Sequence, residues 1–207
     1  MLEELKSAII EGDEDLATEL IKTLLDNGEK PGNILNKGLL KGMDVVGQRF
    51  KTYEMYLPEV IMSATAMKAA IDLLKPHISK ADIVTMGKIV MATIEGDVHD
   101  IGKNLVSMML EGAGFEIIDL GVDVSVKRII ESFCDESADI IGISALLTTT
   151  MLALERAIQL IRESTAGAKV MVGGAPLTHE YAEKIGADGF APDALRAINL
   201  SKNLSGK

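Results

Sequence analysis

The sequence predicts a two-part α/β protein in which a helical bundle precedes a parallel sheet that has helices on both faces. Apolar residues recur every three or four positions over the first ~80 residues, which is the period of a helix. Beyond residue 86, short apolar runs alternate with amphipathic stretches, a pattern typical of a doubly wound sheet. Residues 75–85 between them are a polar stretch with one proline, so we expect domains at residues 1–80 and 86–207.

Four helices are expected in the first domain. Leu2–Ile10 forms the first, and Asp13 can cap a second that continues through Leu24. Two apolar stripes predict the third and fourth helices. Pro58 suits the first turn of the fourth, where its missing N–H is not needed. The stripes are Leu35, Leu39, Met43, Val46 and Phe50, then Val60, Ile61, Ala64, Met67, Ile71 and Leu74.

Five strands and five helices are expected in the second domain. The strands are almost entirely apolar, as in a sheet that is buried on both faces. They are Lys88–Thr93, Phe115–Leu120, Asp139–Ser144, Lys169–Gly173 and Gly186–Phe190. The helices are Gly102–Gly112, Ser125–Glu136, Thr148–Ser164, Thr178–Ile185 and Pro192–Leu200. Ligands of such sheets bind beyond the carboxyl ends of the strands, so a site is expected in the loops that follow the first four strands.

Composition excludes several classes of partner. A net charge of -10 argues against a nucleic acid, and 3% aromatic residues without tryptophan argue against a base-stacking surface. The chain starts with acidic residues, and its apolar runs are far shorter than the ~20 residues that span a bilayer. Cys134 is the single cysteine, which excludes an intramolecular disulfide and fits a reducing compartment. We therefore expect a cytoplasmic protein with no membrane or nucleic-acid partner.

The most informative segment follows the first strand and reads EGDVHDIGKN over residues 95–104. An imidazole can bind a metal when a carboxylate orients its other ring nitrogen, and Asp97 lies two residues before His99. Gly102 would let a bulky ligand approach the backbone closely. The spacing alone fits equally well a polar loop in which Asp100 caps the next helix. No second His or Cys completes a zinc site.

This segment resembles the Asp-x-His-x-x-Gly signature of cobalamin-binding domains, and EGDVHDIGKNLV is similar to the methyl-carrier branch of that family, which is related to methionine synthase. The resemblance implies that His99 replaces the dimethylbenzimidazole of the cofactor as the lower cobalt ligand, the base-off, His-on form. The displaced nucleotide tail would enter a slot in the sheet. In this loop the implied cofactor contacts are Glu95, Gly96, Asp97, Val98, His99, Asp100, Ile101 and Gly102.

Two later segments resemble further parts of the family pattern. SALLTTTM, which begins at Ser144, is similar to its hydroxyl-rich loop, and VGGAP, which begins at Val172, is similar to its Gly-Gly loop. Thr150 stands where methionine synthase has the serine of a His-Asp-Ser relay. Alone, such hydroxyls also fit helix caps and paired glycines fit a tight turn. The implied contacts of the cofactor tail are Ser144, Leu146, Thr148, Gly173, Gly174 and Ala194.

KGMDVVGQRF, which ends at Phe50, and the following YLPEV resemble the helical cap of methionine synthase and its methyl-carrier relatives. Phe50 and Leu57 match an aromatic and a leucine that lie over the methyl face of the corrin. Their spacing alone is also that of ordinary bundle core. An apolar lid would shield a reactive cobalt and must move for chemistry.

The resemblance implies a corrinoid protein with a helical cap, a flavodoxin-like domain and cobalamin bound between them. Cob(I)alamin would take a methyl group from a substrate:corrinoid methyltransferase. Methylcobalamin would then pass the group to a corrinoid:acceptor methyltransferase that uses coenzyme M or tetrahydrofolate. The chain would be the corrinoid-carrying subunit of a methyltransferase system, not catalytic alone, served by a reductive activase. His99, Asp97 and Thr150 would be its chemical centre.

Other classes stay open on the sequence alone. A cobalamin-dependent sensor or regulator would normally carry a DNA-reading domain, which the acidic charge disfavours. A mutase small subunit would not need the helical cap. A response-regulator-like α/β domain would leave the motifs unrelated. Lys103 is expected to be an exposed helix lysine or a partner of a cofactor phosphate or propionamide, and Cys134 a buried or part-buried thiol.

Overall fold

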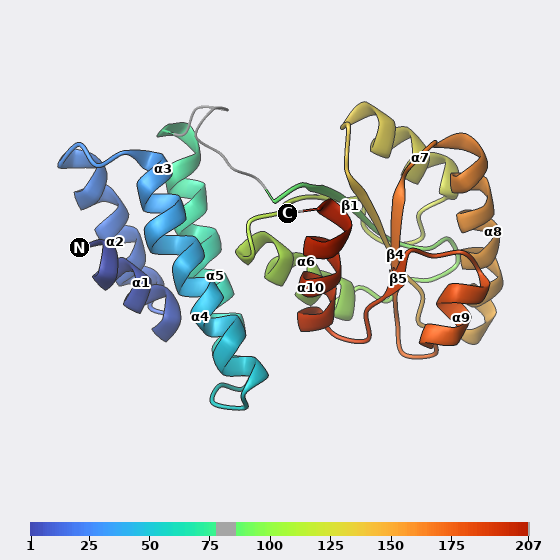
Figure 1. The fold of residues 1–207 in the computed structure, drawn as a ribbon, viewed down its shortest axis with the longest axis horizontal. Helices are drawn as coiled ribbons and strands as arrows, with labels where there is room; N and C mark the ends of the chain where they lie inside the picture. The colour runs from blue at the N-terminus through green and yellow to red at the C-terminus, as the bar shows by residue number, and fades with distance from the viewer. Residues whose placement is uncertain (78–85, 207) are drawn as a thin grey trace. The chain divides into compact units, whose positions relative to one another are not determined.

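The computed structural model describes residues 1–77 and 86–206, and these form two compact units (Figure 1). Within residues 1–77 the backbone forms four helical rods, as the apolar stripes predicted. The third rod is continuous through a π-helical segment, η1, which the sequence did not predict. The bounds are α1 Leu2–Glu11, α2 Glu14–Asp26, α3 Pro31–Asn33, η1 Ile34–Leu39, α4 Leu40–Lys51 and α5 Leu57–Leu74.

Capping and close packing fix this bundle. The Asp13 carboxylate accepts a hydrogen bond of 2.9 Å from Leu16 N and caps α2, as predicted. Gly42 lies against α1, where a Cβ would come within 2.9 Å of the Ile9 Cβ. A glycine at this position therefore lets two helices approach closely. The largest fully buried side chains of the bundle are Leu5, Ile9, Ile21, Ile34, Leu39, Met67 and Leu74.

The second unit is a five-stranded, all-parallel sheet in the order β2-β1-β3-β4-β5 (Figure 1). This is the α/β sheet that the alternating apolar runs predicted. Its strands are β1 Lys88–Thr93, β2 Glu116–Asp119, β3 Ile140–Ser144, β4 Lys169–Gly173 and β5 Gly189–Phe190. The helices are α6 Ile101–Gly112, α7 Val126–Asp135, α8 Thr148–Ser164, α9 His179–Lys184 and α10 Ala194–Ser205.

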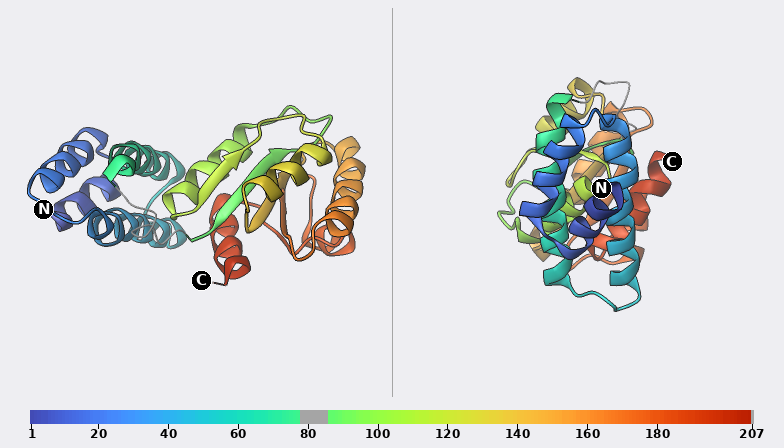
Figure 2. Two further views of the ribbon diagram at one scale, coloured as in Figure 1. Left: turned by 90° about the horizontal axis from the view of Figure 1, so that it is seen from above. Right: turned by 90° about the vertical axis from the view of Figure 1, so that its left-hand side faces the viewer.

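Helices cover both faces of the sheet (Figure 2, left). α7, α8 and α9 bury apolar side chains against one face, and α6 and α10 lie on the other side of the sheet (Figure 1). The strand residues of the first layer are Val90, Ala92, Ile141, Ile143, Val170 and Val172, and its fully or nearly fully buried helix residues include Ile129, Leu154, Ile158 and Ile161. The apolar strands are therefore explained by burial on both sides.

The prediction was wrong for the start of β5, for the bounds of the last helix and for the burial of Cys134. β5 spans only two residues, because Gly186 adopts φ 82° and the chain pairs with β4 only from Gly189 onward. The last helix begins at Ala194 and continues to Ser205, since Asp193 caps it by accepting from Arg196 N. Cys134 is exposed rather than buried, because α7 turns the adjacent Phe133 toward the core.

The strand order creates a topological switch point at the carboxyl ends of β1 and β3. β1 lies between β2 and β3, and its last residue, Thr93, is paired with Ser144 at the end of β3. The chain leaves β1 toward the edge strand β2 and later returns to β3 on the other side of β1. The helices that follow these strands, α6 and α8, lie on opposite sides of the sheet, and ligands of such sheets bind in the crevice at such a point.

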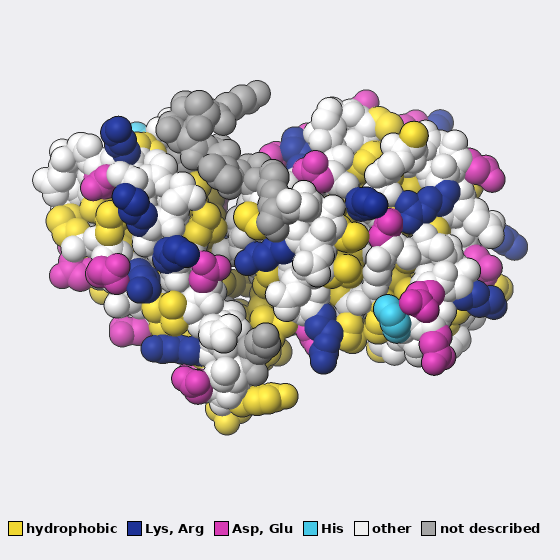
Figure 3. All heavy atoms as spheres, viewed as in Figure 1, with side chains coloured by type: hydrophobic (Ala, Val, Ile, Leu, Met, Phe, Trp, Pro, Cys, Tyr) yellow, Lys and Arg dark blue, Asp and Glu magenta, His cyan; other side chains and the backbone are white. Residues whose placement is uncertain are grey.

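The face drawn in Figure 3 carries charged side chains of both signs. Acidic and basic side chains are interspersed over both units on the face drawn in Figure 3, and the described side chains there form no basic patch. Among the described helices, none combines the length and apolar character that crossing a membrane requires.

An ion pair at the far end of the sheet predicts a pH dependence of folding. Asp188 accepts from Arg162 Nη2 at 2.6 Å and from Val170 N at 2.7 Å, which joins α8 to β4 and the turn before β5. Burial raises the pKa of Asp188, but the hydrogen bonds from Arg162 and Val170 outweigh it and hold that pKa below its ordinary value.

We expect Asp188→Asn to lower the free energy of unfolding by about 1 kcal/mol at neutral pH, because a partly exposed pair is screened by solvent. A lowered folded pKa stabilises the fold above the unfolded pKa, and this contribution is lost as the pH falls through the folded value. The loss should therefore be full above about pH 5 and shrink below about pH 4 in urea unfolding. Asp135→Asn, at an exposed position, is the control. If Asp188→Asn lowers the free energy of unfolding by the same amount across this pH range, the lowered pKa of Asp188 is contradicted.

Candidate functional site

The loop after β1 turns Asp97 inward. Asp97 N donates to Ile94 O at 3.0 Å to close a turn, and Gly96 within it has φ 85°, a conformation that glycine adopts without strain. Ile94 N donates to Ser144 O at 3.0 Å, which attaches the start of the loop to β3. The Asp97 side chain is consequently fully buried at the switch point.

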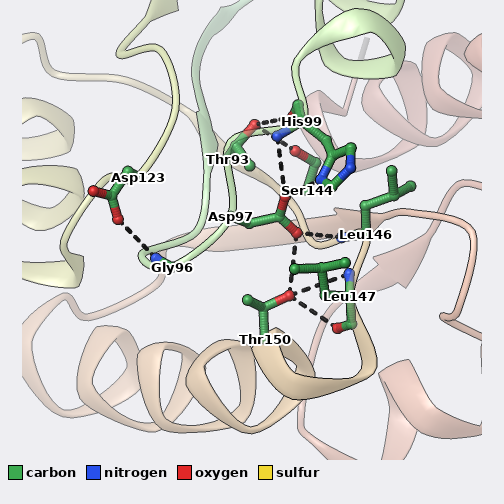
Figure 4. Close-up of polar contacts among 9 residues, drawn as sticks. All are labelled: Thr93, Gly96, Asp97, His99, Asp123, Ser144, Leu146, Leu147 and Thr150. Carbon is green, nitrogen blue, oxygen red and sulfur yellow. Dashed lines mark hydrogen bonds and ion pairs between the residues drawn. The ribbon is translucent and has the colours of Figure 1, made fainter.

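The Asp97 carboxylate accepts four hydrogen bonds (Figure 4). Its Oδ1 accepts from His99 N at 3.1 Å and lies 2.7 Å from His99 Nδ1. Its Oδ2 accepts from Leu146 N at 2.6 Å and from Thr150 Oγ1 at 3.1 Å. Burial raises the pKa of Asp97, but these hydrogen bonds together lower it to about 2. Asp97 is therefore an anion at neutral pH.

This anion sets the tautomer of His99. A carboxylate can only accept, so in the neutral form of His99 the proton is on Nδ1 and Nε2 keeps its lone pair. The imidazole side chain is 48% exposed, and Nε2 has no hydrogen-bond partner among residues 1–77 and 86–206. A neutral imidazole whose Nδ1 is hydrogen-bonded to a carboxylate and whose Nε2 is unpaired can ligate a metal through Nε2.

Thr150 reaches His99 only through Asp97. Its hydroxyl lies 2.9 Å from Leu147 O as well as 3.1 Å from Asp97 Oδ2, and it accepts from Leu147 N at 3.3 Å. One hydroxyl proton is shared between two acceptors, so its bond to the carboxylate is weaker than that of Leu146 N. The Thr150 methyl group packs beside Gly96: a Cβ built on that glycine would lie 3.6 Å from the methyl carbon, an ordinary van der Waals distance.

Apolar side chains are exposed beside the imidazole. Val98 is 70% exposed and Ile101 86% exposed, on either side of His99 in the sequence. Leu146 and Leu147, each 40% exposed, follow β3 at the same edge of the sheet. Gly102 adds open space, because a Cβ there would meet nothing within 4 Å. Such a surface suits a large ligand with apolar edges.

The residues that the family resemblance assigns to the cofactor tail lie at or after the ends of β3 and β4 and at the start of α10. Ser144 Oγ lies 2.9 Å from Thr93 Oγ1, inside the crevice. Thr148 is exposed at the first residue of α8, and Ala194 is buried at the first residue of α10. Packing alone requires a glycine at position 174. A Cβ there would lie 1.9 Å from Ala145 O, because the loops after β3 and β4 approach too closely for a side chain.

Three polar residues complete the site: Thr93 and Asp123 were not assigned to it from the sequence, and Lys103 was given only as an alternative. Thr93 is fully buried and donates to His99 O at 2.9 Å, so Ser144 must donate in the Thr93–Ser144 pair. Lys103 is not an exposed helix lysine: its side chain is 1% exposed, and its Nζ donates to Asp119 at 2.5 and 2.6 Å. The third, Asp123, follows β2. A polar residue closing an apolar strand was the signal for Thr93.

Phe50 and Leu57 belong to the helical unit. Phe50 lies near the end of α4 and is half-buried, whereas Leu57 begins α5 and is 41% exposed. Leu57 is therefore not part of the bundle core. Tyr53 and Tyr56, in the connection between these helices, are also exposed.

Comparison with known proteins identifies both units. One family model of the B12 binding domain matches residues 87–199, and a second B12 binding domain model matches residues 1–75. A corrinoid protein of Desulfitobacterium hafniense is 43% identical over 212 residues, covering 100% of this chain and 98% of the relative. The dimethylamine corrinoid protein of Methanosarcina barkeri is 44% identical over 208 residues, covering 99% and 97%.

The solved structures agree. The structure of the methanol:cobalamin methyltransferase complex MtaBC from Methanosarcina barkeri matches with a TM-score of 0.90 at 29% identity, over 99% of this chain and 79% of that chain. A cobalamin-binding protein from Desulfitobacterium hafniense matches with a TM-score of 0.77 at 30% identity, over 99% and 98%. The chain therefore belongs to the corrinoid proteins of methyltransferase systems, and its cofactor is a corrinoid of the cobalamin type.

Proposed function

We propose that the chain carries a methyl group between two methyltransferases on a corrinoid whose lower cobalt ligand is His99. The observation that carries this proposal is the imidazole itself, with Nδ1 held by the buried Asp97 anion and Nε2 open. The corrinoid, when bound, supplies the cobalt that accepts and gives up the methyl group. The chain alone is not catalytic: it carries the group, and its partner enzymes bind donor and acceptor.

Each residue of the relay has a distinct task. His99 presents the Nε2 lone pair, and Asp97 fixes the tautomer and places a negative charge beside Nδ1. Thr150 donates to the carboxylate oxygen that His99 does not use, so it steadies Asp97 without touching the imidazole. The exposed Val98 and Ile101 supply apolar contact for the corrin ring.

The remaining predictions from the sequence form part of the same proposal. The base-off form places the nucleotide tail in the crevice of the sheet. Residues 1–80 and 86–207 are proposed as two domains with the corrinoid between them, Phe50 and Leu57 covering its methyl face. The proposed tail contacts are Ser144, Leu146, Thr148, Gly173, Gly174 and Ala194, and the other proposed loop contacts are Glu95, Gly96, Asp100 and Gly102.

The proposed partners are a substrate:corrinoid methyltransferase, a corrinoid:acceptor methyltransferase that uses coenzyme M or tetrahydrofolate, and a reductive activase, all in the cytoplasm. Two matches are named for dimethylamine and methanol, which makes these the first methyl donors to assay.

We expect His99→Ala to abolish histidine ligation of the bound corrinoid, because no other imidazole lies in this loop. The apo chain is loaded with hydroxocobalamin, and the visible absorption spectrum and the corrinoid-to-protein ratio are measured. Wild type should retain about one corrinoid per chain with a histidine-ligated spectrum. His179→Ala, which removes an exposed histidine paired with Glu183 on α9, should match wild type. A folded wild type that retains no corrinoid, or an unchanged spectrum in His99→Ala, would sink the proposal.

We expect Asp97→Asn to weaken corrinoid binding by about 10- to 100-fold, since the orienting anion behind the metal ligand is lost. Thr150→Val should be milder, because it removes one shared hydrogen bond and keeps the side-chain shape. Spectroscopic titration of the apo chains gives both dissociation constants. Thr149→Val, at an exposed neighbouring position, controls for the substitution itself. Equal losses for Thr150→Val and Asp97→Asn would contradict this order of roles.

A further inference from the structure

We propose that Asp123, in the loop after β2, is a positioning residue that holds the Asp97–His99 pair in its ligand geometry. The inference rests on the proposed function, because its consequence is corrinoid ligation by His99. Asp123 itself touches neither the imidazole nor any atom that ligates the cobalt. Its action is exerted on the backbone of the turn that carries Asp97.

The loop after β2 runs beside the start of the His99 loop. Thr93 N donates to Gly121 O at 2.9 Å, and Val124 N donates to Thr93 O at 3.0 Å. Ile94 and Val124 form a parallel bridge beyond the last paired residues of β1 and β2. The backbone at residues 121–124 is thus fixed in register with the end of β1, and it can serve as a reference for the turn that follows.

Asp123 holds this turn at two points, and Figure 4 shows the one at Gly96. Its Oδ1 accepts from Gly96 N at 2.7 Å, and its own N donates to Asp97 O at 2.9 Å. With the bond from Asp97 N to Ile94 O, both backbone polar groups of Asp97 are engaged. The peptide units on either side of Asp97 are therefore fixed, and so is the direction of its side chain.

The backbone of Asp123 is itself unusual. Its φ is 53°, and of the described residues other than glycine only Tyr53, Asp123 and Ser137 have positive φ. This conformation costs free energy for most side chains and persists where neighbouring contacts require it. Aspartate and asparagine accept it more readily than other residues. The carboxylate then forms a charge-assisted hydrogen bond to the Gly96 amide, which is stronger than a neutral one.

The geometry behind His99 depends on this placement. The Asp97 carboxylate meets donors from His99, Leu146 and Thr150 at 2.6 to 3.1 Å, and a turn that shifts by a fraction of an ångström loses some of them. Loss of the contact to His99 Nδ1 frees the imidazole to rotate and to exchange tautomers. Asp123 thus acts on cobalt ligation through Gly96 and Asp97.

Three substitutions separate the carboxylate from the backbone conformation. Asp123→Gly keeps positive φ and removes the side chain, Asp123→Ala removes the side chain and disfavours positive φ, and Asp123→Asn keeps both an acceptor oxygen and the conformation. We expect Gly and Ala to raise the dissociation constant for hydroxocobalamin about tenfold and to reduce the histidine-ligated fraction in the visible spectrum. The dissociation constant of Asp123→Asn should stay within about threefold of the wild-type value. Ser137→Ala, at another residue of positive φ in the same unit, is the matched control.

A second readout uses the apo chain and needs no corrinoid. Amide hydrogen exchange at Gly96, followed by NMR, should be about tenfold faster in Asp123→Gly than in wild type or Asp123→Asn. Thermal unfolding shows whether each variant is folded. Wild-type-like binding and exchange in Asp123→Gly would overturn the inference, as would equal damage from Asp123→Gly and Asp123→Asn. If wild type fails to bind hydroxocobalamin, the proposed function fails, and the exchange at Gly96 still decides whether Asp123 fixes the turn.

Discussion

The buried carboxylate of Asp97 is the interaction on which the rest of the site depends. An ionised group away from water is costly unless its oxygens are paired, and here each oxygen accepts two hydrogen bonds. The donors come from the loop after β1 and from the segment after β3. The anion requires them all at once, so it fixes the two segments against each other. The imidazole of His99, which is half exposed, is oriented by this network rather than by packing of its own.

The strand order makes this network possible. In the parallel register Thr93 lies opposite Ser144, and only at this edge do the segments after β1, β2 and β3 meet. The same crowding explains Gly174, whose neighbour Ala145 leaves no room for a Cβ. A switch point therefore provides more than a crevice. It brings together loops that are distant in sequence, so that polar groups from one can satisfy a buried charge on another.

Which features the sequence could predict depends on how far apart the interacting residues lie along the chain. Apolar runs buried on two faces predicted the bounds of β1 and β4 without error, and Asp97 and His99 are close enough in sequence for their pairing to be expected. The bond from Gly96 to Asp123 spans 27 positions and that of Thr93 with Ser144 spans 51, so no local pattern signals either. Lys103 looked like a surface residue because its partner Asp119 is brought beside it only by the sheet.

The low pKa of Asp97 limits what the pair can do. With a pKa of about 2, Asp97 stays ionised at neutral pH, and a carboxylate does not take a proton from a neutral imidazole, which is a far weaker acid. The anion therefore acts on His99 by charge and direction. In the proposed carrier, His99 would hold the cobalt through Nε2, and the adjacent anion would stabilise any positive charge that ligation places on the ring. Asp97 is also held by Leu146 and Thr150, whose hydrogen bonds to Oδ2 do not involve the imidazole. The protein behind His99 would therefore need no reorganisation if the imidazole bound or released a metal.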